Sequence, residues 1–128
     1  MQIHQSAEDY LETILMLNQR MGRVRSIDVV NELGYTKASV SIAMKKLREN
    51  GYIAVDGEGN LTLLEPGREI AERIYSRHRL LTHFFVQLGV DEEVAAEDAC
   101  KAEHILSEQT LEKIREYALL HDAQNSVK

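Results

Sequence analysis

The chain has 128 residues, of which 44% are hydrophobic and 28% charged, so its composition is that of a globular protein and differs from that of a disordered chain. This length accommodates one compact domain or two small ones and excludes a large multi-domain enzyme. The formal net charge of -6 is unusual for a protein that binds nucleic acid, so the placement of the charges matters.

Most of the negative charge lies in the second half of the chain. Residues 1–63 carry seven Lys and Arg against eight Asp and Glu, whereas residues 64–128 carry eight against thirteen. Within residues 36–51, three lysines and an arginine face a single acid, Glu49. The sequence therefore predicts a local basic surface in the first half, and it leaves carboxylates in the second half for a cation.

The first half predicts three helices followed by a β-hairpin. Apolar residues recur at helical spacing over residues 6–19, over residues 27–33 and over residues 38–50. Ser26, with Asp28, is expected to cap the second of these helices, which Gly34 ends. Two short apolar runs, residues 52–55 and 61–64, then flank a turn that contains two glycines, which is typical of a hairpin. Elements in this order form a winged helix-turn-helix.

The second half predicts helices only. After Pro66 and Gly67, residues 68–88 carry apolar side chains at helical spacing over about five turns. Gly89 precedes an acidic helix expected over residues 91–106, and Ser107 is expected to cap a last helix. We therefore expect a mainly α fold with a small β-hairpin, in which a winged helix-turn-helix DNA-binding domain (residues 1–64) is followed by an all-helical domain (residues 65–128).

The helix-turn-helix unit within residues 26–50 predicts DNA binding. In such units the second helix inserts its N-terminal end into the major groove, where hydroxyl groups can contact base edges and lysines can contact phosphates. The alternative is that Thr36 only caps this helix and that the lysines form a solvated face. The candidate DNA-binding residues are Thr36, Lys37, Ser39, Ser41, Lys45 and Lys46.

A second group of residues has the chemistry of a metal site. Asp9 and Glu12 share one face of the first helix, and residues 100, 103 and 104 share one face of the helix expected over residues 91–106. Carboxylate oxygen, imidazole nitrogen and thiolate sulfur together suit a transition metal better than calcium or magnesium. The candidate metal ligands are Asp9, Glu12, His78, Cys100, Glu103 and His104.

Each candidate ligand also has an ordinary structural explanation. Asp9 can belong to a capping box that begins at Ser6, and Glu12 can be a solvated charge. Cys100 can be a small buried hydrophobe and His78 one of several polar residues around it. Spacing alone leaves both explanations open.

Location and catalysis are constrained by what the sequence does not contain. Its beginning lacks the basic and apolar regions of a signal peptide, and no apolar run approaches the roughly 18 residues of a membrane span, so we expect a cytoplasmic protein without a membrane partner. A single cysteine agrees with a reducing compartment. A metalloenzyme with Glu103 or His104 as its base is a rival hypothesis. No nucleophile elbow, phosphate loop or H-E-x-x-H motif accompanies these residues, so we expect neither an enzyme nor a small organic substrate.

Four stretches of the sequence carry a resemblance that covers essentially the whole chain: EDYLETI at residues 8–14, SVS at 39–41, RHRLL at 77–81 and DACKAEHILS at 98–107. In order and spacing they resemble the family of the diphtheria toxin repressor and the manganese transport regulator. The resemblance implies a homodimeric, metal-activated transcriptional repressor that binds double-stranded operator DNA and controls metal-uptake genes. It also implies that residues 65–128 bind the metal and dimerise.

The resemblance further implies which metal is bound. Asp9, Glu12, His78, Glu103 and His104 match ligand positions of the manganese-type members, and the two-domain length resembles the same branch.

Cys100 departs from that pattern, because manganese-type members usually have there a glutamate that bridges two metals, whereas iron-type members have a cysteine. A thiolate would favour softer ions. Ala96 and Thr82 stand where the ancillary site of iron-type members needs a histidine and a glutamate. We expect Mn(II) or Fe(II), with Zn(II) or Co(II) as alternatives.

A set of apolar residues in the second half exceeds what so small a fold buries alone, which predicts a homodimer. The rival is a winged-helix regulator without a metal, whose acidic half only dimerises or contacts another protein. The apolar set comprises Leu80, Leu81, Phe84, Phe85, Leu111, Ile114 and Tyr117.

Overall fold

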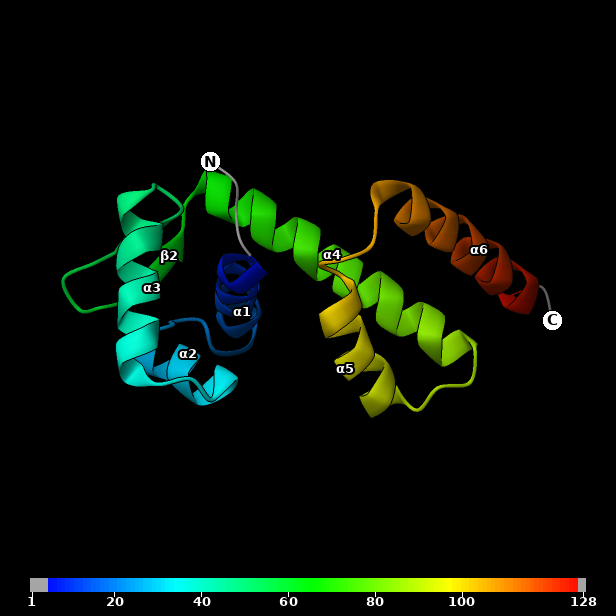
Figure 1. Ribbon diagram of the computed structural model, residues 1–128, viewed down its shortest axis with the longest axis horizontal. Helices are drawn as coiled ribbons and strands as arrows, with labels where there is room; N and C mark the ends of the chain where they lie inside the picture. The colour runs from blue at the N-terminus through cyan, green and yellow to red at the C-terminus, as the bar shows by residue number, and fades with distance from the viewer. Residues whose placement is uncertain (1–4, 127–128) are drawn as a thin grey trace. The chain divides into compact units, whose positions relative to one another are not determined.

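The computed structural model describes residues 5–126, and this part contains six helices and one two-stranded antiparallel sheet (Figure 1). The chain forms two compact units, Met1–Arg73 and Ile74–Lys128, and the boundary between them falls inside one long helix. The mainly α fold with a small hairpin is the one that the sequence predicts.

The first unit is a three-helix bundle with a hairpin. Its hairpin pairs Ile53 with Leu63 and Val55 with Leu61, so that the side chains of Ile53, Leu61 and Leu63 are buried against the helices. Helix α1 packs against α2, α3 and β2, and α3 packs against β1. These elements are α1 (Gln5–Met21), α2 (Ser26–Leu33), α3 (Lys37–Glu49), β1 (Ile53–Val55) and β2 (Leu61–Leu63).

Short polar side chains fix where the helices of this unit begin. Thr36 is the N-cap of α3, and its Oγ1 accepts a hydrogen bond from the backbone N–H of Ser39 at 3.1 Å. The N-cap of α2 is Arg25 rather than Ser26, because the carboxylate of Asp28 accepts from the backbone N–H of Arg25 at 2.9 Å. Gly34 ends α2 with a φ of 71°, a left-handed conformation that glycine adopts readily.

The sequence predicts that the long helix begins at Arg68. In the structure this helix, α4 (Glu65–Gln87), begins three residues earlier. Pro66 lies in its first turn, where the missing N–H removes no helical hydrogen bond. Gly67 is buried there against the backbone of Tyr52, whose carbonyl oxygen also accepts from the backbone N–H of Leu64 at 3.0 Å. The absence of a side chain at Gly67 thus allows the start of α4 to contact the hairpin.

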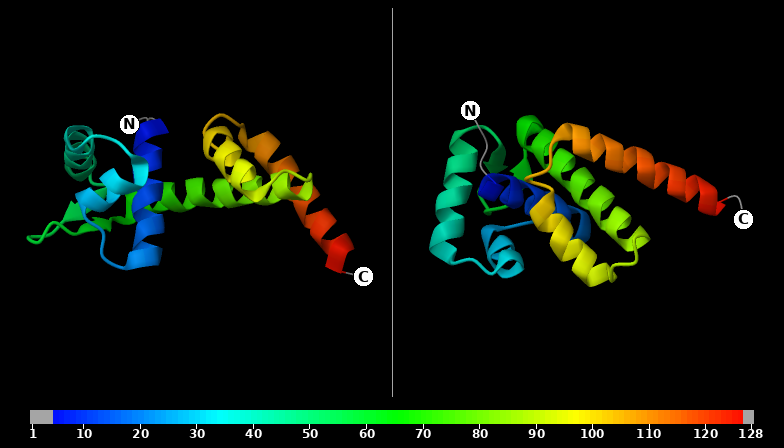
Figure 2. Two further views of the ribbon diagram at one scale, coloured as in Figure 1. Left: turned by 90° about the horizontal axis from the view of Figure 1, so that it is seen from below. Right: turned by 45° about the vertical axis from the view of Figure 1, so that its right-hand side comes forward.

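The second unit contains the rest of α4 with α5 (Glu92–Ala102) and α6 (Glu108–Ser126), which lie side by side (Figure 2). Each helix contributes one residue, Leu81, Ala99 or Leu111, to a buried cluster. The helix expected over residues 91–106 is shorter than predicted, because α5 ends at Ala102 and a turn follows. Ser107 caps α6 as expected, since its Oγ accepts from the N–H of Thr110 at 3.2 Å.

The apolar set expected to dimerise is mostly core. Leu81 and Leu111 are buried, and Leu80, Phe85 and Ile114 pack against them. Tyr117 is exposed and contacts the partly buried Phe84 with ring centroids 5.8 Å apart. Other apolar side chains of this unit are exposed instead, namely Val86, Leu88, Val94, Ile105, Leu119 and Leu120. Among the described residues, no helix has the length and apolar character needed to cross a bilayer.

Candidate metal centre and nucleic-acid interface

Helix α3 presents a buried face and a polar face. Val40, Met44 and Leu47 are buried in the core of the first unit. The outward positions carry hydroxyl groups and lysines, with a helix N-terminus at one end, and this arrangement suits an anionic ligand. All six candidate DNA-binding residues are exposed: Thr36, Lys37, Ser39, Ser41, Lys45 and Lys46.

Two of these hydroxyl groups have a structural role as well. Thr36 Oγ1 accepts from the N–H of Ser39 and donates to Ser39 Oγ at 2.9 Å. The ordinary explanation of Thr36 as a helix cap is therefore correct. Ser39 Oγ keeps its own hydrogen for an external acceptor, since it acts as an acceptor in this contact.

Arg23 and Arg25 were missed by the sequence analysis. The guanidinium of Arg25 donates to the carbonyl oxygen of Glu58 at 2.6 Å, and Arg23 lies 3.8 Å from the Glu58 carboxylate. Arg25 also forms an isolated bridge with Asn60 beside β2. Both arginines line an open pocket of about 410 Å³ at the base of the hairpin, where they add positive charge to the wing. Their signal in the sequence is an arginine pair two residues apart directly before α2.

The turn of the wing is organised by Asp56. Its Oδ1 accepts from the backbone N–H groups of Glu58 and Asn60, both at 2.9 Å, and its Oδ2 accepts from the Asn60 side chain at 3.0 Å. These hydrogen bonds, above all those from Asn60, lower the pKa of Asp56 below its ordinary value. The negative charge of Asp56 thus stabilises the hairpin loop.

In the second unit, Glu103 is fully buried between two imidazoles. His78 Nδ1, from α4, lies 3.2 Å from one carboxylate oxygen, and His104 Nε2 lies 3.4 Å from the other. Cys100 Sγ, on α5, lies within 4.8 Å of a carboxylate oxygen of Glu103. The structure therefore brings three predicted ligands of the second half, His78, Cys100 and His104, around the carboxylate of the fourth, Glu103.

The reason for this grouping differs in part from the expected one. The sequence predicts a continuous helix, but Glu103 is the C-cap of α5 and His104 lies in the turn beyond it. Cys100 is exposed, which contradicts its explanation as a buried hydrophobe. Glu103 keeps a helical backbone conformation, with φ of -59° and ψ of -23°, and this is enough to keep the three side chains near one another.

The remaining two candidates, Asp9 and Glu12, lie on α1 in the first unit. Glu12 is buried with 5% of its surface exposed, so it is not a solvated charge. Asp9 is partly buried. Ser6 lies inside α1, which begins at Gln5, so Ser6 cannot be the N-cap of a capping box that includes Asp9.

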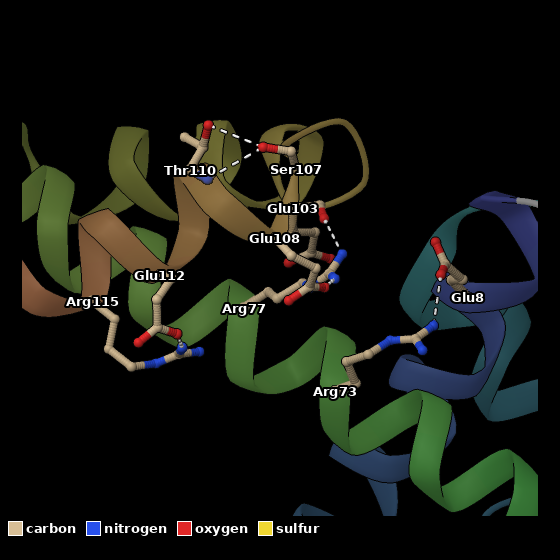
Figure 3. A network of polar contacts seen from close by, with 9 residues as sticks. All are labelled: Glu8, Arg73, Arg77, Glu103, Ser107, Glu108, Thr110, Glu112 and Arg115. Atoms are coloured by element: carbon tan, nitrogen blue, oxygen red, sulfur yellow. Dashed lines mark hydrogen bonds and ion pairs between the residues drawn. The ribbon is translucent and has the colours of Figure 1, made fainter.

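Arg77 is a supporting residue to which the sequence analysis gave no role. Its Nη1 donates to the backbone carbonyl oxygen of Glu103 at 3.3 Å, and its other Nη forms an ion pair with Glu108 (Figure 3). It thereby links α4 to the turn after α5 and to the first turn of α6. The signal in the sequence is its position directly before His78.

The chemistry of this cluster fits a divalent transition metal. Within the part of the chain that the structure describes, neither oxygen of Glu103 accepts a hydrogen bond of good geometry. His78 Nδ1 is likewise buried and makes no hydrogen bond of good geometry there. A buried carboxylate in that condition is costly unless a cation compensates it. Imidazole nitrogen, carboxylate oxygen and sulfur are ligands that divalent metals of the first transition row accept.

Comparisons with known families cover nearly the whole chain. Residues 2–61 match the family described as "Iron dependent repressor, N-terminal DNA binding domain". Residues 64–120 match "Iron dependent repressor, metal binding and dimerisation domain". An HTH-type transcriptional regulator of Methanocaldococcus jannaschii is 36% identical over 113 residues, which are 87% of this chain and 90% of that protein. The HTH-type transcriptional regulator MntR of Bacillus subtilis is 35% identical over 109 residues, which are 85% of this chain and 77% of that one.

Solved structures agree with these matches. One described as a manganese-dependent transcriptional repressor in complex with manganese has a TM-score of 0.80 at 28% identity, and the match covers 88% of this chain and 52% of that chain. The IdeR structure from T. acidophilum has the same TM-score at 23% identity, with coverage of 91% and 55%, which shows likeness of fold. This chain thus spans about half the length of those solved chains. Because both family domains match and two curated relatives exceed 30% identity, the chain belongs to the family of metal-dependent transcriptional repressors that includes the diphtheria toxin repressor and the manganese transport regulator.

Proposed function

We propose that this protein is a homodimeric repressor that binds operator DNA when it is loaded with a divalent transition metal, Mn(II) or Fe(II), and that it controls metal-uptake genes. The observation that carries the proposal is the fully buried carboxylate of Glu103 between His78 and His104, in a chain whose first unit is a winged helix-turn-helix. Without a metal, a carboxylate buried between two imidazoles destabilises the fold. With a metal bound, the same three groups serve as its ligands.

The ligand set of the proposed site comprises His78, Glu103 and His104 of the second unit, completed by Asp9 and Glu12 of the first. The burial of Glu12 supports this assignment, because glutamate is rarely buried unless a partner group or a metal compensates its charge. Three carboxylates would more than neutralise the charge of a divalent ion, while the imidazoles supply nitrogen ligands.

Cys100 is the residue on which the choice of metal depends. Its exposed position near Glu103 allows the thiol to act as a further ligand. Coordination through sulfur would shift the preference from Mn(II) toward Fe(II), Zn(II) or Co(II). If sulfur does not bind, the oxygen and nitrogen ligands add no preference for softer ions, and selection of Mn(II) then depends on the geometry of the site and on the supply of the metal.

A bound metal would supply positive charge that stabilises the buried carboxylates. The residues of the chain would do the rest. His78 and His104 would offer neutral ring nitrogens, and Arg77 would hold the backbone of Glu103 in place. The metal would raise the population of the DNA-competent conformation only if it binds that conformation more tightly than the other. Without metal this conformation would be a minor one, so the apo protein should bind DNA weakly.

Two surfaces would carry the partners. The polar face of α3, with Lys37, Lys45 and Lys46, would contact DNA. Exposed apolar side chains of the second unit, among them Ile105 (77% exposed) and Leu120 (65%), would be covered in the homodimer.

The test is fluorescence anisotropy of a labelled duplex from the promoter of a metal-uptake gene. Protein is titrated first with chelator and then with Mn(II), with anaerobic Fe(II) and with Zn(II). We expect one ion to raise the affinity at least about tenfold, which corresponds to ~1.4 kcal/mol of coupling. A variant carrying both Glu103→Ala and His104→Ala should lose this response, and Glu112→Ala, on the exposed surface of α6, should keep it.

Equal binding with and without every ion would contradict the metal-activated mechanism. It would favour the second candidate function, a metal-independent winged-helix regulator. The absence of specific binding to any such duplex, with and without metal, would contradict operator recognition itself.

A further inference from the structure

Ile42 occupies an unusual position on α3. It is 58% exposed, although it is a large aliphatic residue in the middle of a helix. Residues three and four positions away share its face, whereas Val40, Met44 and Leu47 occupy the opposite, buried side. Ile42 therefore points directly away from the core of the first unit.

The neighbours of Ile42 indicate what kind of ligand this face suits. Ala38 and Ser39 lie one turn before it, and Lys45 and Lys46 lie one turn after it; all four are exposed. Lysine ammonium groups attract phosphate, and the N-terminus of α3 adds to that attraction. The apolar side chain of Ile42 beside two lysines therefore suits a ligand that carries several phosphates and exposes an apolar group between them.

Helix stability does not account for isoleucine at this position. A β-branched residue has a lower helix propensity than lysine, glutamate or alanine, and an exposed one contributes little packing. Thr36 caps α3 through the backbone N–H of Ser39 and donates to Ser39 Oγ at 2.9 Å, so capping accounts for the hydroxyl group of Thr36. Among the described outward residues of α3, Ile42 is thus the large apolar one, and neither capping nor packing explains it.

We propose that Ile42 is a specificity-determining residue that contacts the 5-methyl group of a thymine in the major groove, an inference that rests on the proposed binding of operator DNA. Thymine is the base that displays a methyl group in that groove. Isoleucine has no donor or acceptor, so it discriminates through this methyl alone. Lys45 and Lys46 hold the backbone, and Ile42 selects the base between them.

Deoxyuridine tests the contact because it lacks only this methyl group. The probe is a duplex enriched from a random-sequence library by the full chain in the presence of Mn(II), or of anaerobic Fe(II) or Zn(II) where Mn(II) enriches none. Each thymine of the duplex is replaced singly by deoxyuridine, and the dissociation constants are measured for three proteins. These are the wild type, Ile42→Ala, and the control Ile27→Ala, which truncates an isoleucine 43% exposed on α2.

We expect at least one replacement to weaken binding of the wild type and of Ile27→Ala about fourfold, which corresponds to the ~0.8 kcal/mol of one buried methyl-sized group. Ile42→Ala should bind both duplexes equally, and its unchanged melting temperature should show that the fold is intact. The inference is overturned if no replacement affects the wild type or if Ile42→Ala retains the full loss. Failure to enrich any duplex would instead overturn the proposed DNA-binding function, and the inference with it.

Discussion

Gly67 and Tyr52 approach so closely that a Cβ on Gly67 would lie 2.2 Å from the carbonyl oxygen of Tyr52. The contact joins the first turn of α4 to the segment that leads into β1. Because the obstructing atom belongs to the backbone, it cannot move aside as a flexible side chain could. This contact makes Gly67 the glycine of the winged unit that is most sensitive to substitution.

Gly67→Ala should therefore destabilise the protein by about 1–3 kcal/mol, the usual cost of forcing additional atoms into a packed site. Denaturant unfolding followed by circular dichroism measures the effect. The control is Gly57→Ala, since a Cβ at Gly57 meets no atom within 4 Å and its φ is not in the left-handed region. Equal unfolding midpoints for the two variants would contradict the role assigned to Gly67.

Glu103→Gln should separate the apo state from the metal-bound state. The substitution removes a buried charge, so the metal-free variant should be at least as stable as the metal-free wild type. With Mn(II) at about 100 times the dissociation constant, the wild type should gain ~2.7 kcal/mol, and the variant should gain almost nothing. Thermal unfolding with chelator and with metal gives both values. A gain in the variant equal to that of the wild type would exclude Glu103 as a ligand.

Arg77→Lys tests the support of the proposed site. Lysine keeps the positive charge but cannot donate to the Glu103 carbonyl and pair with Glu108 through a planar fork. We expect metal affinity, measured by competition with a chelator of known affinity, to fall about 10- to 100-fold. Arg115→Lys is the matched control, because Arg115 pairs with Glu112 on the exposed surface of α6 at 2.7 Å. A parallel loss in the control would indicate a general effect of replacing arginine.

Asp56 gives the wing a predictable dependence on pH. Hydrogen bonds lower its pKa in the folded state, so its contribution to stability is fully present above the ordinary pKa of about 3.9 and is lost as the pH falls through the lowered value. Asp56→Asn should therefore be less stable than the wild type at pH 6, and the difference should shrink as the pH falls below about 4. Denaturant unfolding of both proteins at a series of pH values measures this difference. A difference that is constant with pH would mean that the charge of Asp56 has no role.

The fold and half of the candidate metal site follow from local patterns in the sequence. Gly34, Gly89 and Ser107 mark helix ends by chemistry that acts over one turn, and all three do so in the structure. Likewise, the spacing of Glu103 and His104 from Cys100 predicts that the three side chains lie near one another. They do so in the structure although α5 ends at Ala102.

The features that sequence analysis missed depend on contacts between distant residues. The end of α5 at Ala102 accompanies the hydrogen bond from Arg77 to the Glu103 carbonyl, a contact across 26 residues. The place of Arg25 beside Glu58 becomes visible only when the hairpin folds back. Ile42 was missed for another reason, because a pattern of apolar residues predicts a core and gives no sign of an apolar residue that stays outside it.

The two faces of α3 also bear on how such a protein diverges. Val40, Met44 and Leu47 are buried and hold the helix in place, whereas the side chain of Ile42 is 58% exposed and points away from the core. A substitution at position 42 therefore needs no compensating change elsewhere in the chain, and closely related sequences can drift there at little cost to folding. Duplication of the gene followed by one change at this codon would be enough to give two descendants with the same architecture and separate sets of binding sites.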